Sequence, residues 1–292
     1  MKHIRANGLD FGYLEMGEGP LVLLLHGFPD TPGTWEHQIP ALAAAGYRAV
    51  APSLRGYPPT EIPRDGYYDK ATLATDVAEL IRVLGGGQPV HLVGQDWGAI
   101  IGYAVLAAFP GLVRRAVLMA VPHPAEADRS LLDPKHIHRS FHWWYFQMHG
   151  LPEKALAAND FAFVDYLWDY WTAPGHKDAA HIAGIKRMLA EPGVLASTLG
   201  YYRAMFDAQK ADPRLQDVRA RMNGPIGVPT LALCGAEDLR AELMQAQAKH
   251  FTGEYRFELV PGAGHFPQRE RPAEVTRLVL DWLGSPHEGL QA

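Results

Sequence analysis

The chain has 292 residues, of which 48% are hydrophobic and 20% charged, a composition typical of folded globular proteins rather than disordered ones. Its 27 basic and 32 acidic residues give a net charge of −5, so there is no electrostatic reason to expect nucleic acid or an anionic membrane as a partner. The single cysteine, Cys234, excludes an internal disulfide and any CxxC metal or redox site.

The N-terminal segment contains neither an apolar run of signal-peptide length nor a small-residue cleavage site. The apolar run at 21–25 is far too short to span a bilayer. These features predict a cytoplasmic protein without a membrane partner. They leave the oligomeric state open, with a homodimer as one alternative.

Short apolar runs recur along the chain, as expected of parallel strands that are buried on both faces. They lie at 21–25, 48–51, 90–93, 116–120, 230–233 and 257–260. Segments of helix length, including 72–84 and 98–108, separate them. Strands that alternate with helices predict an α/β fold with a mostly parallel sheet flanked by helices.

This alternation stops near Pro122, and the next hundred residues are helix-like and rich in aromatic side chains. We predict a core formed by residues 1–122 and 225–292, interrupted by a helical cap at 123–224. The cap would cover the carboxyl edge of the sheet, where open α/β sheets bind ligands. A helical subdomain with a core of its own is the alternative.

The segment GQDWG at 94–98 follows an apolar strand and leads directly into a helix. This is the strand–turn–helix arrangement of a nucleophile elbow, with glycines on both sides of the central Asp96. The alternative is that Asp96 is an ordinary helix N-cap. Two later residues favour catalysis: Asp238 follows a predicted strand and His265 follows the next one, in the order nucleophile, acid, histidine.

The segment HGFP at 26–29 directly follows the first predicted strand of the core. A backbone N–H in this place contributes to the oxyanion hole of α/β-hydrolases, together with the N–H of the residue after the nucleophile. We therefore expect Phe28 and Trp97 to supply the two donors.

With these motifs the chain resembles the α/β-hydrolase superfamily, and within it the epoxide hydrolases that use an aspartate nucleophile. The resemblance covers roughly residues 8 to 284 and is carried by HGFP, RGY, GQDWGA, VPHP, YFQ, YYRA, GAED and GHFPQRERP. It implies no cofactor. The histidines at 136, 138, 142 and 149 lack the carboxylate partners and the spacing of a hydrolytic metal site, so we also predict no metal. The resemblance also implies a small apolar epoxide and water as the reactants.

An aspartate in place of serine has a chemical consequence. A carboxylate that attacks a saturated carbon forms an ester, which water activated by His265 and Asp238 can cleave. The resemblance places Tyr202 where epoxide hydrolases keep a ring-opening tyrosine, and His142 at the partner position, where many members have tyrosine. We predict that both polarise the epoxide oxygen. Aromatic side chains are expected to line the substrate pocket: Trp35, Trp143, Tyr145, Phe146 and Tyr201.

Two other functions remain open. His142 and Trp143 resemble the halide-binding pair of fluoroacetate dehalogenases, so a haloalkane or haloacid dehalogenase is the alternative enzyme. Against it, no arginine follows the nucleophile, and Phe28 stands where haloalkane dehalogenases usually have asparagine. The third possibility is a ligand-binding protein that has kept the fold without the activity.

Overall fold

The computed structural model describes residues 1–284, apart from the side chains of residues 128–130, and contains one eight-stranded sheet. The strands occur in the order β1-β2-β4-β3-β5-β6-β7-β8. Those from β4 to β8 are parallel, which confirms the predicted fold class. The strands are β1 Lys2–Ala6, β2 Leu9–Met16, β3 Leu21–Leu25, β4 Arg48–Pro52, β5 Val90–Gln95, β6 Val113–Met119, β7 Thr230–Gly235 and β8 Tyr255–Val260.

The sequence prediction missed the antiparallel strands β1 and β2. The reason is that β1 forms the edge of the sheet and is largely exposed, so it lacks a continuous apolar run. The other edge strand, β8, was predicted as buried on both faces, and that prediction is wrong. Only Val260 of β8 is fully buried, whereas every residue of the central strand β3 is buried. The difference arises because β8 is an edge strand with a neighbouring strand on one side only.

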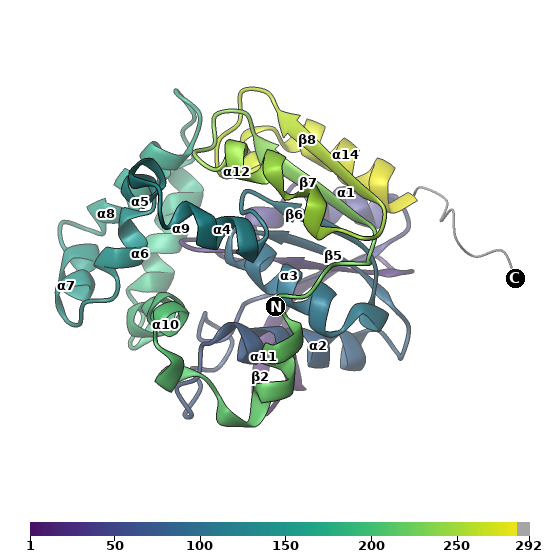
Figure 1. Ribbon diagram of the computed structural model, residues 1–292, viewed down its shortest axis with the longest axis horizontal. Helices are drawn as coiled ribbons and strands as arrows, with labels where there is room; N and C mark the ends of the chain where they lie inside the picture. The colour runs from purple at the N-terminus through teal and green to yellow at the C-terminus, as the bar shows by residue number, and fades with distance from the viewer. Residues whose placement is uncertain (285–292) are drawn as a thin grey trace, which may run out of the picture.

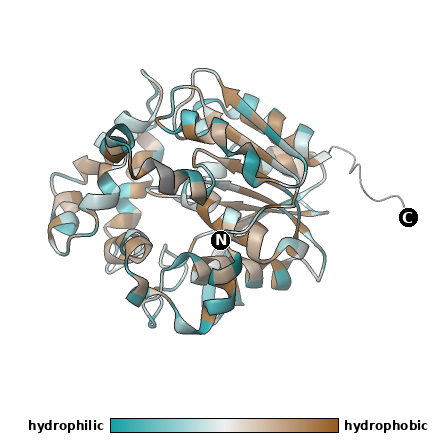
Figure 2. Ribbon diagram, in the orientation of Figure 1, coloured by the Kyte–Doolittle hydropathy of each residue, from teal (hydrophilic) through white to brown (hydrophobic). Residues whose placement is uncertain are grey.

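Helices cover both faces of the sheet (Figure 1). On one face, α1 (Gln38–Ala44) and α14 (Pro272–Gly284) pack together over β4 and β6. On the other face, α2 (Lys70–Leu84) and α3 (Trp97–Ala108) pack together over β5 and β6. The apolar side chains divide accordingly into two large clusters, and the hydrophobic colouring of the central strands in Figure 2 marks the layer between them.

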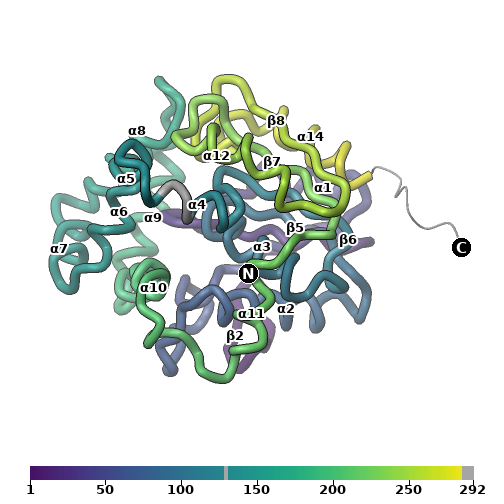
Figure 3. The backbone as a smooth tube through the Cα atoms, viewed as in Figure 1, coloured from purple at the N-terminus to yellow at the C-terminus, as the bar shows by residue number. Residues whose placement is uncertain are grey.

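A helical segment connects β6 to β7, as predicted for the interruption of the core. In Figures 1 and 3 most of it lies beside the sheet, whereas α11 lies against α2 and α3. Its helices are α4 Pro124–Ser130, α5 Pro134–Arg139, α6 Phe141–Tyr145, α7 Leu151–Ala157, α8 Ala162–Trp171, α9 Ala179–Leu189, α10 Val194–Phe206 and α11 Gln216–Arg221. We call residues 123–224 the cap, although their status as a separate domain stays a prediction.

Hydrogen bonds join the cap to loops at the carboxyl edge of the sheet. The Trp168 indole donates to the carbonyl of Pro29 at 3.2 Å, next to the HGFP segment. The His181 ring lies 2.6 Å from the Asp30 carboxylate in the same loop. These contacts place the cap over the ends of β3 and its neighbours. Within the described chain, no helix has the length and apolar character needed to cross a bilayer.

Candidate active site

Asp96 occupies the turn between β5 and α3. Its backbone has φ 51° and ψ −119°, an unfavourable conformation for a residue with a side chain. Its carboxylate makes no hydrogen bond that caps α3, so helix capping does not explain the residue. Instead, Oδ1 accepts a 2.7 Å hydrogen bond from the backbone N–H of Phe28, at the end of β3.

Glycines make this turn possible because three backbone segments meet there. A Cβ atom on Gly98 would lie 2.2 Å from the carbonyl oxygen of Leu25, and one on Gly94 would lie 2.4 Å from the carbonyl oxygen of Gly98. A Cβ atom on Gly27 would lie 2.4 Å from the Asp96 carboxylate. Glycine is therefore required for the close approach of the HGFP loop to the nucleophile turn.

His265 and Asp238 lie opposite Asp96, at the ends of β8 and β7. His265 Nδ1 is 2.9 Å from Asp238 Oδ2, and His265 Nε2 is 3.4 Å from Asp96 Oδ2. The backbone N–H of Arg240 donates to Asp238 Oδ1 at 2.8 Å, which fixes the acid. The structure therefore brings together the three residues predicted as nucleophile, acid and base.

The two carboxylates determine the charge of His265. Burial lowers its pKa, but the charges and hydrogen bonds of Asp238 and Asp96 outweigh burial and raise the pKa to about 9. At neutral pH the resting site therefore holds a protonated imidazole between two carboxylates. His265 can act as a base only after one of the negative charges has been removed.

This raised pKa predicts how stability depends on pH. An unfolded histidine has a pKa of about 6.5, so the stabilisation is complete below that pH and is lost as the pH rises towards 9. We expect His265 to account for up to about 3 kcal/mol of the unfolding free energy lost over this range. In Asp96→Asn one of the two charges is absent, so urea unfolding from pH 6.5 to 9.5 should show a smaller loss.

The exposed Asp169, which pairs with Lys177, offers a matched control. Asp169→Asn should keep the pH dependence of the unmodified protein. An identical loss of stability in the Asp96→Asn protein would contradict the proposed charge state of His265.

On the cap side, Tyr202 and His142 converge above the nucleophile turn. Tyr202 projects from α10, and the centroid of its ring lies 5.3 Å from that of Phe28, 5.4 Å from Trp97 and 5.6 Å from His142. Burial and the negative charge of Asp96 raise the pKa of Tyr202 well above its usual range. The phenol therefore keeps its proton and can donate it.

His142 is also buried, and its Nδ1 has no hydrogen-bond partner among the described residues. Burial and the positive charges of Arg240 and His265 lower its pKa well below 6.5. The ring is therefore neutral at physiological pH. In this form it carries one N–H that can polarise an oxygen without transferring a full charge.

The aromatic residues that we predicted to line the pocket lie in different parts of the structure. Phe146 packs edge-on against Tyr202 and Phe28, on the wall of the site. Tyr145 lies further out, half-buried and stacked on Phe163. Trp35, by contrast, belongs to the apolar cluster under α1 and α14, not to the cluster that holds Tyr202. Its predicted place in the pocket is therefore corrected to a place in the core.

The remaining two predicted lining residues also have contacts outside the site. The ring of Trp143 is buried and lies under the guanidinium of Arg240. The hydroxyl of Tyr201 donates to the carbonyl of Arg55 at 2.7 Å. Tyr201 thus anchors α10, and the adjacent Tyr202 is held by that anchor.

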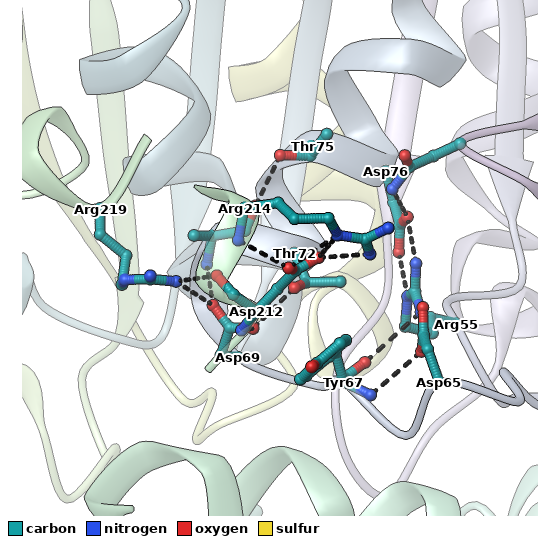
Figure 4. Close-up of polar contacts among 12 residues, drawn as sticks. Arg55, Asp65, Tyr67, Asp69, Thr72, Thr75, Asp76, Asp212, Arg214 and Arg219 are labelled. Carbon is teal, nitrogen blue, oxygen red and sulfur yellow. Dashed lines mark hydrogen bonds and ion pairs between the residues drawn. The ribbon is translucent and has the colours of Figure 1, made fainter. Parts of the chain in front are cut away.

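Figure 4 shows Arg55 beside a second group of polar residues, which joins Asp69 of the core to Asp212 near the C-terminal end of the cap. The guanidinium of Arg55 makes two hydrogen bonds to Asp76, at 2.6 and 2.8 Å. Nearby, Asp69 accepts from Thr72 and from the backbone N–H of Asp212. A large surface hollow of about 1140 Å³ borders these residues, but it contains none of the predicted site residues.

Two residues at the site escaped the sequence prediction. Trp171, at the end of α8, has its ring 4.9 Å from that of His142 and 5.3 Å from that of His265. Glu270 accepts hydrogen bonds from the backbone N–H groups of Gly264 and Phe266, on either side of His265. The motif GHFPQRERP contains Glu270, but spacing alone does not reveal which amides its carboxylate binds.

Among the described residues, no group of three or more His, Cys, Asp and Glu side chains is arranged to hold a metal ion. The groups that converge on Asp96 are instead an imidazole, a phenol and backbone N–H donors. Such a set can bind an oxygen atom, move a proton and stabilise an oxyanion.

Comparisons with known proteins agree with this geometry. The family model of the alpha/beta hydrolase fold matches residues 20–272. Epoxide hydrolase 3 of Xenopus tropicalis is 31% identical, over 96% of this chain and 76% of its own, and epoxide hydrolase A of Mycobacterium tuberculosis is 30% identical, over 96% of both chains. The crystal structure of a Bacillus megaterium epoxide hydrolase with an inhibitor superposes with a TM-score of 0.83 at 26% identity, covering 97% of this chain and 100% of that one. The chain therefore belongs to the α/β hydrolase fold family, among relatives that are named epoxide hydrolases.

Proposed function

We propose that this protein hydrolyses epoxides to vicinal diols through an ester formed on Asp96. One observation carries the proposal: the nucleophile position holds a carboxylate, with the base His265 on one side and the protonated phenol of Tyr202 above it. A carboxylate suits attack on a saturated carbon, because the resulting ester can be cleaved by water.

In the first step Asp96 Oδ2 attacks an epoxide carbon, and the bond from that carbon to the ring oxygen breaks. Oδ1 is the less suitable nucleophile since it already accepts the Phe28 N–H. The ring oxygen leaves as an alkoxide and takes a proton from Tyr202, while the N–H of His142 polarises it. Tyr202 then regains a proton.

The charges balance within the site. Esterification removes the negative charge of Asp96, which is one cause of the high pKa of His265. The pKa of His265 therefore falls, and His265 releases one proton. This proton balances the one that the alkoxide takes up. The base therefore becomes available when the ester has formed, which is when it is needed.

In the second step His265 removes a proton from a water molecule that attacks Cγ of Asp96. Negative charge develops on Oδ1, where the Phe28 N–H already donates; we propose the Trp97 N–H as the second donor. Collapse of this intermediate breaks the bond from Cγ to the diol oxygen. The proton on His265 passes to the departing diol oxygen, which leaves Asp96 as a carboxylic acid. Asp96 then gives its proton to His265, and the resting pair of carboxylate and imidazolium is restored.

The surroundings support an apolar substrate. The rings of Phe28, Trp97 and Phe146 pack around Tyr202 beside the nucleophile turn. A related structure at 27% identity, from Bacillus megaterium, contains its product, a naphthyloxypropanediol. We propose an epoxide whose ring carries an apolar aryl or alkyl group.

Dehalogenation is the second candidate, because the His142–Trp143 pair could bind a halide. A halide needs no proton donor, however, whereas the site contains the buried, protonated phenol of Tyr202. This phenol favours the epoxide over the halide.

The test is turnover with matched substrates. Styrene oxide, 1-naphthyl glycidyl ether and 1,2-epoxyhexane are compared with 1-bromohexane and fluoroacetate, and diols and halide ions are measured. We expect diols from at least one epoxide. Halide release without diol would support a dehalogenase, and the absence of both, with reversible epoxide binding, would support a ligand-binding protein.

A further inference from the structure

Arg240 differs from the other buried arginines of the described chain. Only 6% of its surface is exposed, yet among the described residues no carboxylate lies within ion-pair distance of its guanidinium. Within the described part of the chain, its one side-chain hydrogen bond is a long contact of 3.4 Å to Ser140 Oγ. The other buried arginines each pair with a carboxylate: Arg55 with Asp76, Arg115 with Glu254, Arg203 with Glu153 and Arg269 with Asp178.

The position of Arg240 is as unusual as its lack of a partner. It follows Asp238 by two residues, and its guanidinium lies 5.6 Å from the centroid of the Trp143 ring, in the layer between the cap and the core. It is close enough to His142 and Tyr202 for its charge to lower the pKa of both. The cation therefore borders the residues that are proposed to receive the epoxide oxygen.

A buried cation without a counter-ion is costly, since the lost hydration is replaced only in part by a ring face and a hydroxyl. An anionic group of a ligand could supply the missing partner, and the guanidinium has a planar fork of N–H donors that matches a carboxylate. We propose that Arg240 is a subsite for a carboxylate on the substrate, so that the preferred substrates are epoxy acids.

This inference rests on the proposed function and narrows it. Arg240 lies beside the ring-opening residues, so the carboxylate must be separated from the epoxide by a short chain of definite length. The chain would pass the Trp143 ring, which offers an apolar surface. Arg240 would thus determine specificity without touching the reacting atoms.

The first experiment measures kcat/KM for a series of terminal epoxy acids, from 5,6-epoxyhexanoate to 10,11-epoxyundecanoate, and for the matched amides. We expect the acid to exceed its amide by about 10- to 100-fold at one chain length, as for a hydrogen-bonded buried charge. Arg240→Gln should reduce this ratio towards one, and Arg240→Lys, which keeps the charge, should retain part of it. The exposed Arg256 provides the matched control, since Arg256→Gln should keep the ratio.

Equal kcat/KM for acids and amides at every length would overturn the inference. The inference would also be overturned if Arg240→Gln lowered kcat/KM by the same factor for acids and amides, because an equal loss would indicate a structural role. A second experiment separates this inference from the proposed function by measuring the binding of hexanoate and hexanamide by calorimetry. Tighter binding of hexanoate that is lost in Arg240→Gln supports the subsite even if no epoxide is hydrolysed, and equal affinities exclude it.

Discussion

Asp96→Asn is expected to abolish diol formation, with a fall in kcat/KM of about 10⁴-fold or more. The amide has nearly the same shape as the carboxylate, and its oxygen can still accept the Phe28 N–H. It lacks the negative charge that attacks the epoxide carbon, so no ester can form. Diol production with excess epoxide, measured by chromatography, checks the prediction.

A labelling experiment determines whether the role of Asp96 is covalent. In a single turnover in H₂¹⁸O, the oxygen added to the diol should come from Asp96 and carry no label, and the label should appear in the protein. Direct attack by water would instead label the diol in the first turnover. That result would contradict the ester even if Asp96→Asn were inactive, since Asp96 could then be a general base.

The sequence predicted the centre of the site well because its residues lie at the ends of strands. Parallel strands bring their carboxyl ends to one edge, so Asp96, Asp238 and His265 had to lie near one another once their strands were recognised. The glycines of HGFP and GQDWG point to the same place, because only glycine permits the close backbone approach at Gly27 and Gly98.

The rest depends on contacts between segments that are far apart in the chain. Nothing in the local sequence reveals that Tyr201 bonds to Arg55, 146 residues away, or that Trp171 meets His265. Trp35 illustrates the same limit, since an aromatic residue near the HGFP motif can face either side of the sheet. The local sequence also does not reveal that Arg240 has no counter-ion among residues 1–284, apart from the undescribed side chains of 128–130.

His265→Gln is expected to separate the two steps. Asp96 attacks the epoxide without help from the base, so alkylation should proceed, whereas activation of water should fail. Steady-state turnover should fall by about 10²- to 10⁴-fold, while intact-mass spectrometry detects one molecule of epoxide added to each chain. The exposed His37 is a matched control, and His37→Gln should turn over normally without an adduct.

The pH dependence of adduct formation shows whether His265 supplies the proton of the first step. We propose that His265 is charged only while Asp96 is charged, so it releases a proton when the ester forms. The alkoxide takes its proton from Tyr202, and with glutamine at position 265 no imidazolium can replace that proton. Tyr202 must then be reprotonated from solvent, so the rate of adduct formation should fall as the pH rises. The unmodified protein holds that proton up to its pKa of about 9 and should alkylate at a constant rate to a higher pH. An adduct rate with the same pH dependence in both proteins would mean that the proton comes from solvent, and His265 would then serve only the second step.

An adduct that also forms in the double variant Asp96→Asn/His265→Gln would place the ester on another residue and exclude Asp96 as the nucleophile.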